Sequence, residues 1–474
     1  MLQNYLKNKI LKNIEYQPTN DQMNLIDLLS EFIVDQKNNM VLISKGYAGT
    51  GKTITLSALV KTLYEFNINF ILMAPTGRAA KVLSAYSGFK AYTIHKIIYR
   101  QKSSKDGFGR FVLDTNFSKN TIFIVDEASL ISNISSADSF FGSGNLLDDL
   151  IEYVYSGKNC KLILTGDIAQ LPPVGTPISA ALDENILSKY NLDVIKTELK
   201  EVVRQSQQSG ILMNATYIRN NIIKGKEQIP IIKVSNYSDM FSITGNELVD
   251  CLEEAYSKYG YENVIVICRS NKRANLINNG IRRRLLSREE ELSAGDLIMV
   301  VKNNYFWAND KNDNSFIANG EIAVVDKIYN FEEQYNFKFA NILISFPDFD
   351  NLQIKAKVML NTLTSENASL ALSEHKELFN TILNEIIENN ENKNKKKLVN
   401  DVRNNEYFNA LQIKYAYAIT CHKSQGGQWK SVFIDAGYLI NENINSEFLR
   451  WLYTAFTRAT EELYLINFNQ SYIA

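Results

Sequence analysis

Short apolar runs alternate with amphipathic segments along the first half of the chain. The runs lie at 40–44, 70–74, 121–125 and 161–165, and each is followed by a polar or glycine-rich loop. Between them, segments such as 54–63 repeat apolar residues at helical spacing. Runs this short and this apolar are typical of strands buried on both faces. The pattern predicts an α/β fold in which parallel strands alternate with helices and polar loops gather at the carboxyl ends of the strands.

The loop after the first run reads G-Y-A-G-T-G-K-T over 46–53, which is a complete P-loop motif between a strand and a helix. Such a loop directs backbone N–H groups and a helix N-terminus at a polyphosphate. Lys52 would reach the β and γ phosphates, and the Thr53 hydroxyl would bind Mg²⁺. We therefore predict ATP and Mg²⁺ as cofactors. The predicted nucleotide-binding residues are Gly46, Ala48, Gly49, Thr50, Gly51, Lys52 and Thr53.

A helix is predicted over 15–33, and Gln22 lies in its first turn. A glutamine amide can donate to and accept from the edge of an adenine base at the same time. Because Gln22 lies just upstream of the P-loop, adenine binding and an ordinary surface position both stay open.

Two adjacent carboxylates, Asp126 and Glu127, follow the third apolar run. Asp126 is predicted to hold the Mg²⁺ shell, and Glu127 to orient and deprotonate the attacking water. Adjacent acids after a strand also occur at simple helix starts, but the P-loop upstream favours catalysis. Gln170 follows the fourth run and is placed to sense a γ phosphate or the water.

The segment 97–113 has the features of a β-hairpin, because Asp106-Gly107 separates two strand-like stretches. From Lys96 to Arg110 there are five basic residues and one acidic residue. Phe108 lies at or near the tip, and an exposed aromatic residue between glycines is unusual for a mere connection.

The second half predicts a further strand at 264–268 and a helix over 269–286. From Arg269 to Arg288 there are seven basic and no acidic residues, which fits either a solvated helix face or a nucleic-acid-facing surface. Between 292 and 358 the pattern changes to short strands separated by turn residues. A polar, Lys-rich run at 389–397 is predicted to be a connector.

Composition narrows the possibilities only slightly. The 474 residues are too many for one compact core, which predicts more than one domain. The 51 basic and 52 acidic residues leave a net charge of −1, so any nucleic-acid binding must come from local basic surfaces. The four cysteines form no C-x-x-C pair, which argues against a zinc ribbon and fits a reducing compartment. Because no apolar run reaches spanning length and no signal-peptide core is found, we expect a cytoplasmic protein without a membrane partner.

Several stretches together resemble the ordered motifs of superfamily 1 helicases, and more narrowly the RecD-like and Dda-like branch, superfamily 1B. In the first half the resemblance lies in A-P-T-G-R-A-A-K (74–81), T-I-H (93–95), V-D-E-A-S (125–129) and G-D-x-x-Q-L-P-P-V-G (166–175). In the second half it lies in 201–205, 417–426 and 452–459, which resemble motifs IV, V and VI. Thr176 and Cys421 depart from the usual pattern, but neither removes a group that the chemistry requires.

The resemblance implies two RecA-like parallel-sheet domains of a P-loop NTPase, with a β-hairpin inserted in the first and an SH3-like β-barrel in the second. The expected domains are 1–96 and 117–197 (ATP-binding domain 1A), 97–116 (hairpin 1B, a pin), 198–290 and 408–474 (domain 2A), and 291–407 (SH3-like insertion with a helical extension, 2B).

The resemblance also assigns roles. Lys52, Glu127 and Gln170 of the first domain and Arg204 and Arg458 of the second would form a catalytic site that is complete only when the cleft closes. Phe108 would stack on the base pair at the fork. The remaining implied nucleic-acid contacts are Thr76, Arg78, Thr93, His95, Thr420, His422 and Lys423. Taken singly, those of the first domain fit a capping threonine and a surface arginine better than a strand contact.

The expected function is an ATP-dependent DNA helicase that moves along single-stranded DNA, 5′-to-3′ by resemblance, and unwinds duplex. Its expected partners are single-stranded DNA, single-strand/duplex junctions and replication or repair proteins, and we expect a monomer. The alternatives are a single-strand translocase or RNA helicase of the same superfamily, a non-motor nucleotide switch, and a nucleic-acid-binding module without turnover.

Overall fold

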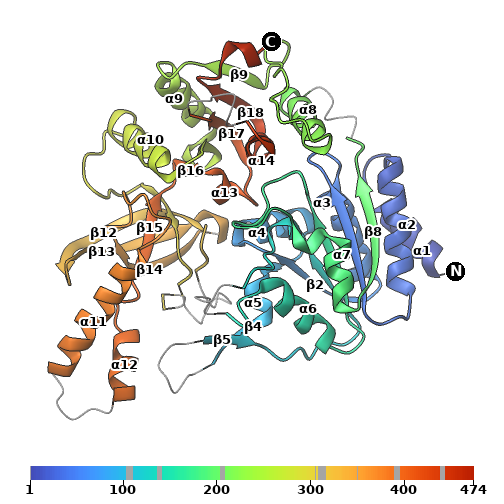
Figure 1. The fold of residues 1–474 in the computed structure, drawn as a ribbon, viewed down its shortest axis with the longest axis horizontal. Coiled ribbons are helices and arrows are strands. Elements are labelled where there is room, and N and C mark those ends of the chain that lie inside the picture. The colour runs from blue at the N-terminus through green and yellow to red at the C-terminus, as the bar shows by residue number, and fades with distance from the viewer. Residues whose placement is uncertain are drawn as a thin grey trace.

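A computed structural model describes residues 2–102, 110–135, 141–202, 209–304, 306–307, 317–349, 351–388, 395–437 and 444–474. The described chain forms two parallel sheets, one closed barrel and one two-stranded hairpin. In Figure 1 the first sheet and its helices lie on the right, the second lies at the top, and the barrel lies on the left. The predicted fold class, two RecA-like units with a hairpin and a barrel inserted, is confirmed.

The first sheet has six strands in the order β3-β2-β6-β7-β1-β8, all parallel. The four central strands match the apolar runs of the sequence, because helices cover both faces and each face has its own apolar core. The strands are β1 Met40–Gly46, β2 Asn69–Ala74, β3 Ala91–Thr93, β6 Thr121–Val125, β7 Lys161–Gly166 and β8 Asp193–Leu199. The helices are α1 Leu2–Lys12, α2 Asn20–Val34, α3 Lys52–Glu65, α4 Gly77–Ser87, α5 Ile94–Ile98, α6 Leu146–Ser156 and α7 Glu184–Leu187.

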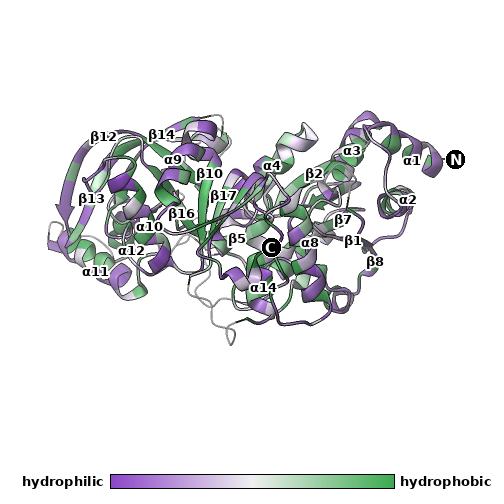
Figure 2. Cartoon of the chain, turned by 90° about the horizontal axis from the view of Figure 1, so that it is seen from above, coloured by the Kyte–Doolittle hydropathy of each residue, from purple (hydrophilic) through white to green (hydrophobic). Residues whose placement is uncertain are grey.

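The second sheet has five strands in the order β16-β10-β17-β18-β9, also all parallel. Seen from above in Figure 2, hydrophobic residues concentrate on inner strands such as β10 and β17, whereas α1 is largely hydrophilic. The strands are β9 Met240–Ile243, β10 Val264–Cys268, β16 Ala418–Thr420, β17 Trp429–Asp435 and β18 Ala459–Ile466. The helices are α8 Gly210–Ile223, α9 Leu248–Tyr259, α10 Asn271–Arg284, α13 Cys421–Ser424 and α14 Ser446–Phe456.

One strand of the closed barrel lies in a segment that the predicted boundaries assign to domain 2A. Its strands are β11 Leu297–Val300, β12 Ile322–Gln334, β13 Phe337–Phe346, β14 Leu352–Met359 and β15 Leu411–Tyr415. β15 pairs with both β11 and β14, although the predicted boundary gives residues from 408 onward to domain 2A. Two helices, α11 Leu372–Glu388 and α12 Lys395–Arg403, pack on the barrel, so the predicted connector 389–397 ends inside a helix.

A buried carboxylate fixes the root of the barrel to the second sheet. Asp296 is fully buried and accepts hydrogen bonds from Arg282 at 3.0 Å, Arg288 at 2.8 Å and the Tyr417 hydroxyl at 3.1 Å. The Tyr417 hydroxyl in turn accepts from the backbone N–H of Leu297 at 3.1 Å. Two of the seven basic residues counted in the sequence therefore belong to a structural network.

The hairpin consists of β4 Tyr99–Lys102 and β5 Arg110–Leu113, which pair antiparallel. Its predicted turn, Asp106-Gly107, and Phe108 lie outside the described residues.

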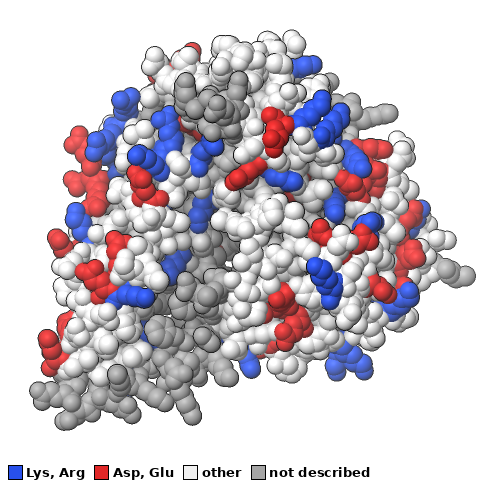
Figure 3. All heavy atoms as spheres, in the orientation of Figure 1, with Lys and Arg blue, Asp and Glu red and all other residues white. Residues whose placement is uncertain are grey.

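On the face drawn in Figure 3, basic and acidic side chains are interspersed, as the net charge of −1 suggests. Within the described chain, no helix combines the length and the apolar character needed to cross a membrane.

Candidate nucleotide site between the two sheets

The P-loop connects β1 to α3 and adopts a conformation that requires glycine. Gly49 and Gly51 have φ of +74° and +80°, and Gly51 caps the N-terminus of α3. A Cβ added to Gly46 would lie 2.7 Å from Cγ of Lys52. The Lys52 ammonium donates to the backbone carbonyls of Gly46 at 2.6 Å and Tyr47 at 3.0 Å. The side chain therefore lies against the P-loop, where the phosphates are predicted to bind.

The Gln22 side chain forms a hydrogen bond with the backbone of this loop. Its side chain is fully buried, and its amide donates to the Thr50 carbonyl at 2.9 Å and to the Tyr16 hydroxyl at 3.0 Å. Its Oε1 accepts from the Thr19 N–H at 3.0 Å as half of a capping box at the start of α2. The described contacts of Gln22 are thus made with the protein itself, and one of them reaches the P-loop residue before Gly51.

Two oxygen ligands suited to Mg²⁺ lie at the ends of neighbouring elements. The Thr53 hydroxyl is 3.5 Å from Oδ2 of Asp126, which follows β6. Oδ1 of Asp126 accepts from the Thr165 hydroxyl at 2.8 Å and from the Glu127 N–H at 2.9 Å, and these bonds orient the carboxylate. Mg²⁺ keeps several waters and phosphate oxygens as ligands, so one hydroxyl and one carboxylate fit it. The part of the chain that the structure describes contains no cluster of three or more His, Cys, Asp or Glu side chains arranged for a metal.

Glu127 has the environment of a catalytic base. Its backbone φ is +53°, and its Oε2 is buried with no hydrogen-bond partner among the described residues. Burial raises the pKa of Glu127, while the positive charge of Arg458 lowers it and the neighbouring Asp126 raises it. The buried Oε1 of Gln170, at the end of the adjacent strand β7, is likewise without a partner among the described residues. Each of these oxygens can accept a hydrogen bond from a water molecule.

Arg458 brings a positive charge from the second unit. It follows α14, is 3% exposed, and donates to the Thr454 carbonyl, the Gly427 carbonyl and the Thr457 hydroxyl, each at 3.1 Å. Although it belongs to the other unit, its positive charge lowers the pKa of Glu127. Arg204, the other predicted arginine, lies outside the described residues.

A second buried arginine of this unit, Arg219 in α8, escaped the sequence analysis. Its guanidinium lies 4.5 Å from the ring centroid of Tyr47 in the P-loop, and the side chain is 8% exposed. The Tyr47 hydroxyl donates to Glu198 at the end of β8 at 2.7 Å. Arg219 follows the buried residue Ile218 in α8, and its contact with Tyr47 joins residues far apart in the chain, which no spacing within the helix indicates.

Among the predicted nucleic-acid contacts, two from the first unit lie against the second unit. The Thr76 hydroxyl caps α4 by accepting from the Ala79 N–H at 3.2 Å. The Arg78 guanidinium stacks 3.8 Å from the ring centroid of Trp429 and donates to the Gln428 carbonyl at 3.2 Å.

Thr93 and His95 lie at the start of α5. The Thr93 hydroxyl caps this helix by accepting from the Lys96 N–H at 3.3 Å. His95 packs against Phe141 and Tyr99, with centroid distances of 4.8 Å and 5.6 Å, and burial lowers its pKa to about 4. The imidazole is therefore neutral near pH 7 and lies among aromatic rings.

The predicted contacts of the second unit surround α13. Thr420 caps this helix without a side-chain hydrogen bond, and His422 is exposed. Lys423 donates to Oδ1 of Asn319 at 2.5 Å, and burial lowers the pKa of Lys423 to about 8. Lys423 thus contacts the segment that precedes β12 of the barrel.

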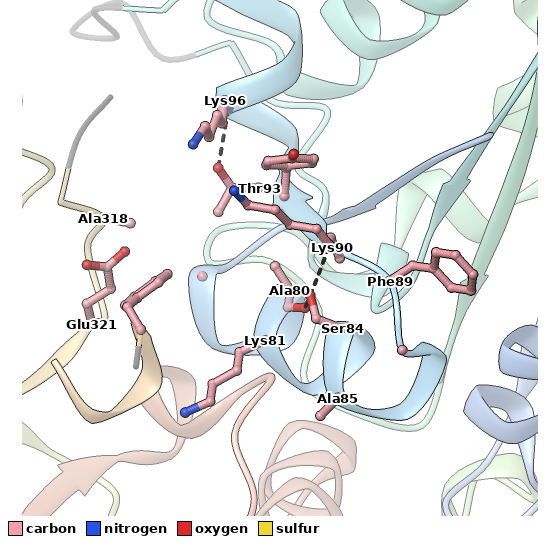
Figure 4. Close-up of a pocket in the computed structure, with 15 residues that line it drawn as sticks. Ala80, Lys81, Ser84, Ala85, Phe89, Lys90, Thr93, Lys96, Ala318 and Glu321 are labelled. Carbon is pink, nitrogen blue, oxygen red and sulfur yellow. Dashed lines mark hydrogen bonds between the residues drawn. The ribbon is translucent and has the colours of Figure 1, made fainter. Parts of the chain in front are cut away.

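A groove of about 620 Å³ separates α4, β3 and α5 from the barrel. Figure 4 shows Lys90 and Lys96 beside the segment that carries Thr93, facing Ala318 and Glu321 of the barrel side. The two lysine ammonium groups lie 5.4 Å and 5.3 Å from the ring centroid of Tyr92. Basic groups around an aromatic ring suit a single nucleic-acid strand. Lys90 and Tyr92 were not predicted, and Lys96 was counted only with the hairpin, although the stretch K-A-Y-T-I-H-K, with lysines on both sides of a tyrosine, carries the signal.

Comparison with known proteins gives two family matches. The family described as an AAA domain matches residues 33–229, and the UvrD-like helicase C-terminal domain matches residues 415–466. The chain is 25% identical to the uncharacterized protein R530 of Acanthamoeba polyphaga mimivirus, over 92% of this chain and 97% of that protein. It is 24% identical to the ATP-dependent DNA helicase dda of Enterobacteria phage T4, over 60% of each protein. A solved structure of the Pif1 helicase from Bacteroides with ADP-AlF3 and ssDNA aligns over 97% of this chain and 95% of that chain, at 18% identity and a TM-score of 0.49.

Proposed function

We propose that this chain, a relative of the RecD-like and Dda-like helicases of superfamily 1B, is an ATP-dependent DNA helicase. The observation that carries the proposal is the divided site. Thr53, Asp126, Glu127 and Gln170 come from one sheet. Arg458 belongs to the other unit, just beyond the helix whose Tyr453 and Thr454 contact Ala48 and Leu171 of the first. A site completed by two units works only when they approach, so turnover is tied to a change in their separation. The names of the phage T4 relative and of the UvrD-like family support the helicase assignment.

Each side chain has a defined task in this proposal. ATP with Mg²⁺ supplies the phosphoanhydride bond whose hydrolysis releases free energy. Lys52 and the P-loop N–H groups bind the phosphates, while Thr53 and Asp126 hold the metal. Glu127 orients and deprotonates the water, which its raised pKa and free oxygen favour. Arg458 stabilises the charge that develops in the transition state.

The groove between the first unit and the barrel is the proposed path of single-stranded DNA. Lys90 and Lys96 would neutralise phosphates, and Tyr92 offers a ring on which a base can stack. Because residues of both units border this region, closing and opening of the ATP site would move the strand. We propose 5′-to-3′ movement, a direction that rests on the resemblance alone.

Strand-dependent hydrolysis and unwinding test the function together. We expect ATP hydrolysis to rise with single-stranded DNA more than with RNA of equal length, and a 5′-tailed duplex to be unwound in preference to 3′-tailed and blunt duplexes. Lys52→Ala should abolish both activities, whereas the matched control Lys37→Ala, on the surface before β1, should change neither.

The alternatives each have a distinct outcome. Hydrolysis stimulated by DNA without any unwinding would identify a translocase, and stronger stimulation by RNA would identify an RNA helicase. No hydrolysis under any condition would refute the proposal.

A further inference from the structure

Tyr453 of α14 joins two nucleotide-facing loops of the opposite unit. Its side chain is 1% exposed, and its hydroxyl donates to Oδ2 of Asp167 at 2.6 Å. The same hydroxyl accepts from the backbone N–H of Ala48 at 3.0 Å. Ala48 belongs to the P-loop, and Asp167 belongs to the loop that follows β7 and carries Gln170. One side chain of the second unit thus links the two loops on which the phosphates and the water would lie.

The chemistry of the three groups fixes the direction of these hydrogen bonds. The Ala48 N–H can only donate, so the Tyr453 hydroxyl accepts from it and directs its single proton at Oδ2 of Asp167. Burial raises the pKa of Tyr453 far above its ordinary value, which keeps that proton on the hydroxyl. Asp167 is fully buried, and its other oxygen, Oδ1, accepts from the Ala169 N–H at 2.9 Å. Both ends of the link are therefore held in one orientation.

The helix that carries Tyr453 also sets the position of Arg458. The next residue, Thr454, accepts from the Leu171 N–H at 2.9 Å through its hydroxyl, and its carbonyl accepts from Arg458 at 3.1 Å. Arg458 lies five residues after Tyr453, just beyond the end of α14. A shift of this helix relative to the P-loop would move the guanidinium relative to Glu127 by a similar distance.

We propose that Tyr453 is a positioning residue, which aligns Arg458 with the P-loop and with the Gln170 loop for hydrolysis. This inference rests on the proposed ATPase function. Tyr453 acts on turnover through Arg458 and does not itself bind the nucleotide. Because a displacement of about 1 Å can cost about 10²-fold in rate, loss of two short hydrogen bonds at this point has a large expected effect on kcat.

Tyr453→Phe removes the hydroxyl and keeps the ring. Strand-stimulated kcat should fall about 10- to 100-fold, while the KM for ATP should change by less than about 3-fold, because binding groups are retained. The double variant Tyr453→Phe/Arg458→Ala should be no slower than Arg458→Ala alone, since the hydroxyl acts through the arginine. The matched control is Tyr417→Phe, which removes an equally buried hydroxyl placed between a backbone N–H and the carboxylate of Asp296. That variant should lose stability and keep kcat.

A kcat for Tyr453→Phe equal to the wild-type value, or losses that add in the double variant, would overturn the inference. If Tyr453→Phe does not fold, Asp167→Asn weakens the same hydrogen bond without altering α14 and should give the same split between kcat and KM. Binding of ADP with aluminium fluoride, compared with ADP alone, provides a readout independent of turnover. If Tyr453→Phe binds ADP with aluminium fluoride more weakly than the wild-type protein but binds ADP alone equally well, the positioning role is supported, even if the wild-type protein shows no strand-stimulated hydrolysis. If the variant binds both ligands as the wild-type protein does, the role is refuted.

Discussion

Gln22 provides a test of whether this residue supports the P-loop or recognises adenine. The substitution Gln22→Ala removes the donor to the Thr50 carbonyl and the acceptor for the Thr19 N–H. A buried carbonyl left without a partner costs about 1–3 kcal/mol, and the lost capping bond adds about 0.5–1 kcal/mol. The sum is about 1.5–4 kcal/mol of unfolding free energy, which at about 2–4 °C per kcal/mol lowers the melting temperature of a unit of this size by about 3–16 °C.

The effect on catalysis separates the two roles. If Gln22 acts on the P-loop, the Gln22→Ala variant should raise the KM for ATP and for GTP equally, because the loop contacts phosphates and not the base. The assay is steady-state hydrolysis of both nucleotides, combined with thermal unfolding. The matched control is Gln36→Ala, since Gln36 is exposed and donates to the Val34 carbonyl at 3.2 Å outside α2. Unchanged melting with a loss confined to ATP would refute the support role and establish adenine recognition.

Three further substitutions address the rest of the proposed machinery. Glu127→Gln should retain ATP and strand binding while kcat falls about 10²- to 10⁴-fold, measured by equilibrium binding and steady-state turnover; wild-type turnover would remove its role as base. Arg458→Ala should lower kcat far more than ATP affinity. The positive charge of Arg458 lowers the pKa of Glu127, so that pKa should rise in the variant, and the loss of rate on the acid side should begin at a higher pH. A pH–rate profile that does not shift would contradict this pairing. Phe108→Ala, outside the described residues, should reduce duplex unwinding but not strand-stimulated hydrolysis; a joint fall would make the hairpin a structural loop.

The local hydrophobic pattern of the sequence was sufficient to predict the central strands of each sheet but not the strands at the edges. The buried strand β10 is apolar throughout and β6 is apolar after Thr121, so five residues identify each of them. The edge strand β8 is exposed or half-buried over its first four residues, and β3 has only three residues, so neither carries that signal. β15 includes the buried polar residue Lys414, and its place in the barrel depends on pairing with strands far away in sequence.

The same distinction applies to the site. Thr53, Asp126, Glu127 and Gln170 follow strands of one sheet, and parallel topology brings the ends of neighbouring strands together, so their proximity followed from the predicted order. The contact of Tyr453 with Ala48 joins residues far apart in the chain and on different sheets. No spacing rule predicts such a contact, because it depends on how the two units dock.

The docked surface also explains how the two candidate sites can influence each other. Arg458, at the ATP site, donates to the Gly427 carbonyl at 3.1 Å. Arg78, at the start of α4 beside the groove, donates to the carbonyl of the next residue, Gln428, and stacks on Trp429. A Cβ added to Gly427 would lie 2.9 Å from Nε of Arg78, so the loop and the guanidinium are already in close contact. In the proposed cycle, a movement of Arg458 would therefore reach Arg78 through a loop of three residues, and a strand that engaged Arg78 would act on the same loop.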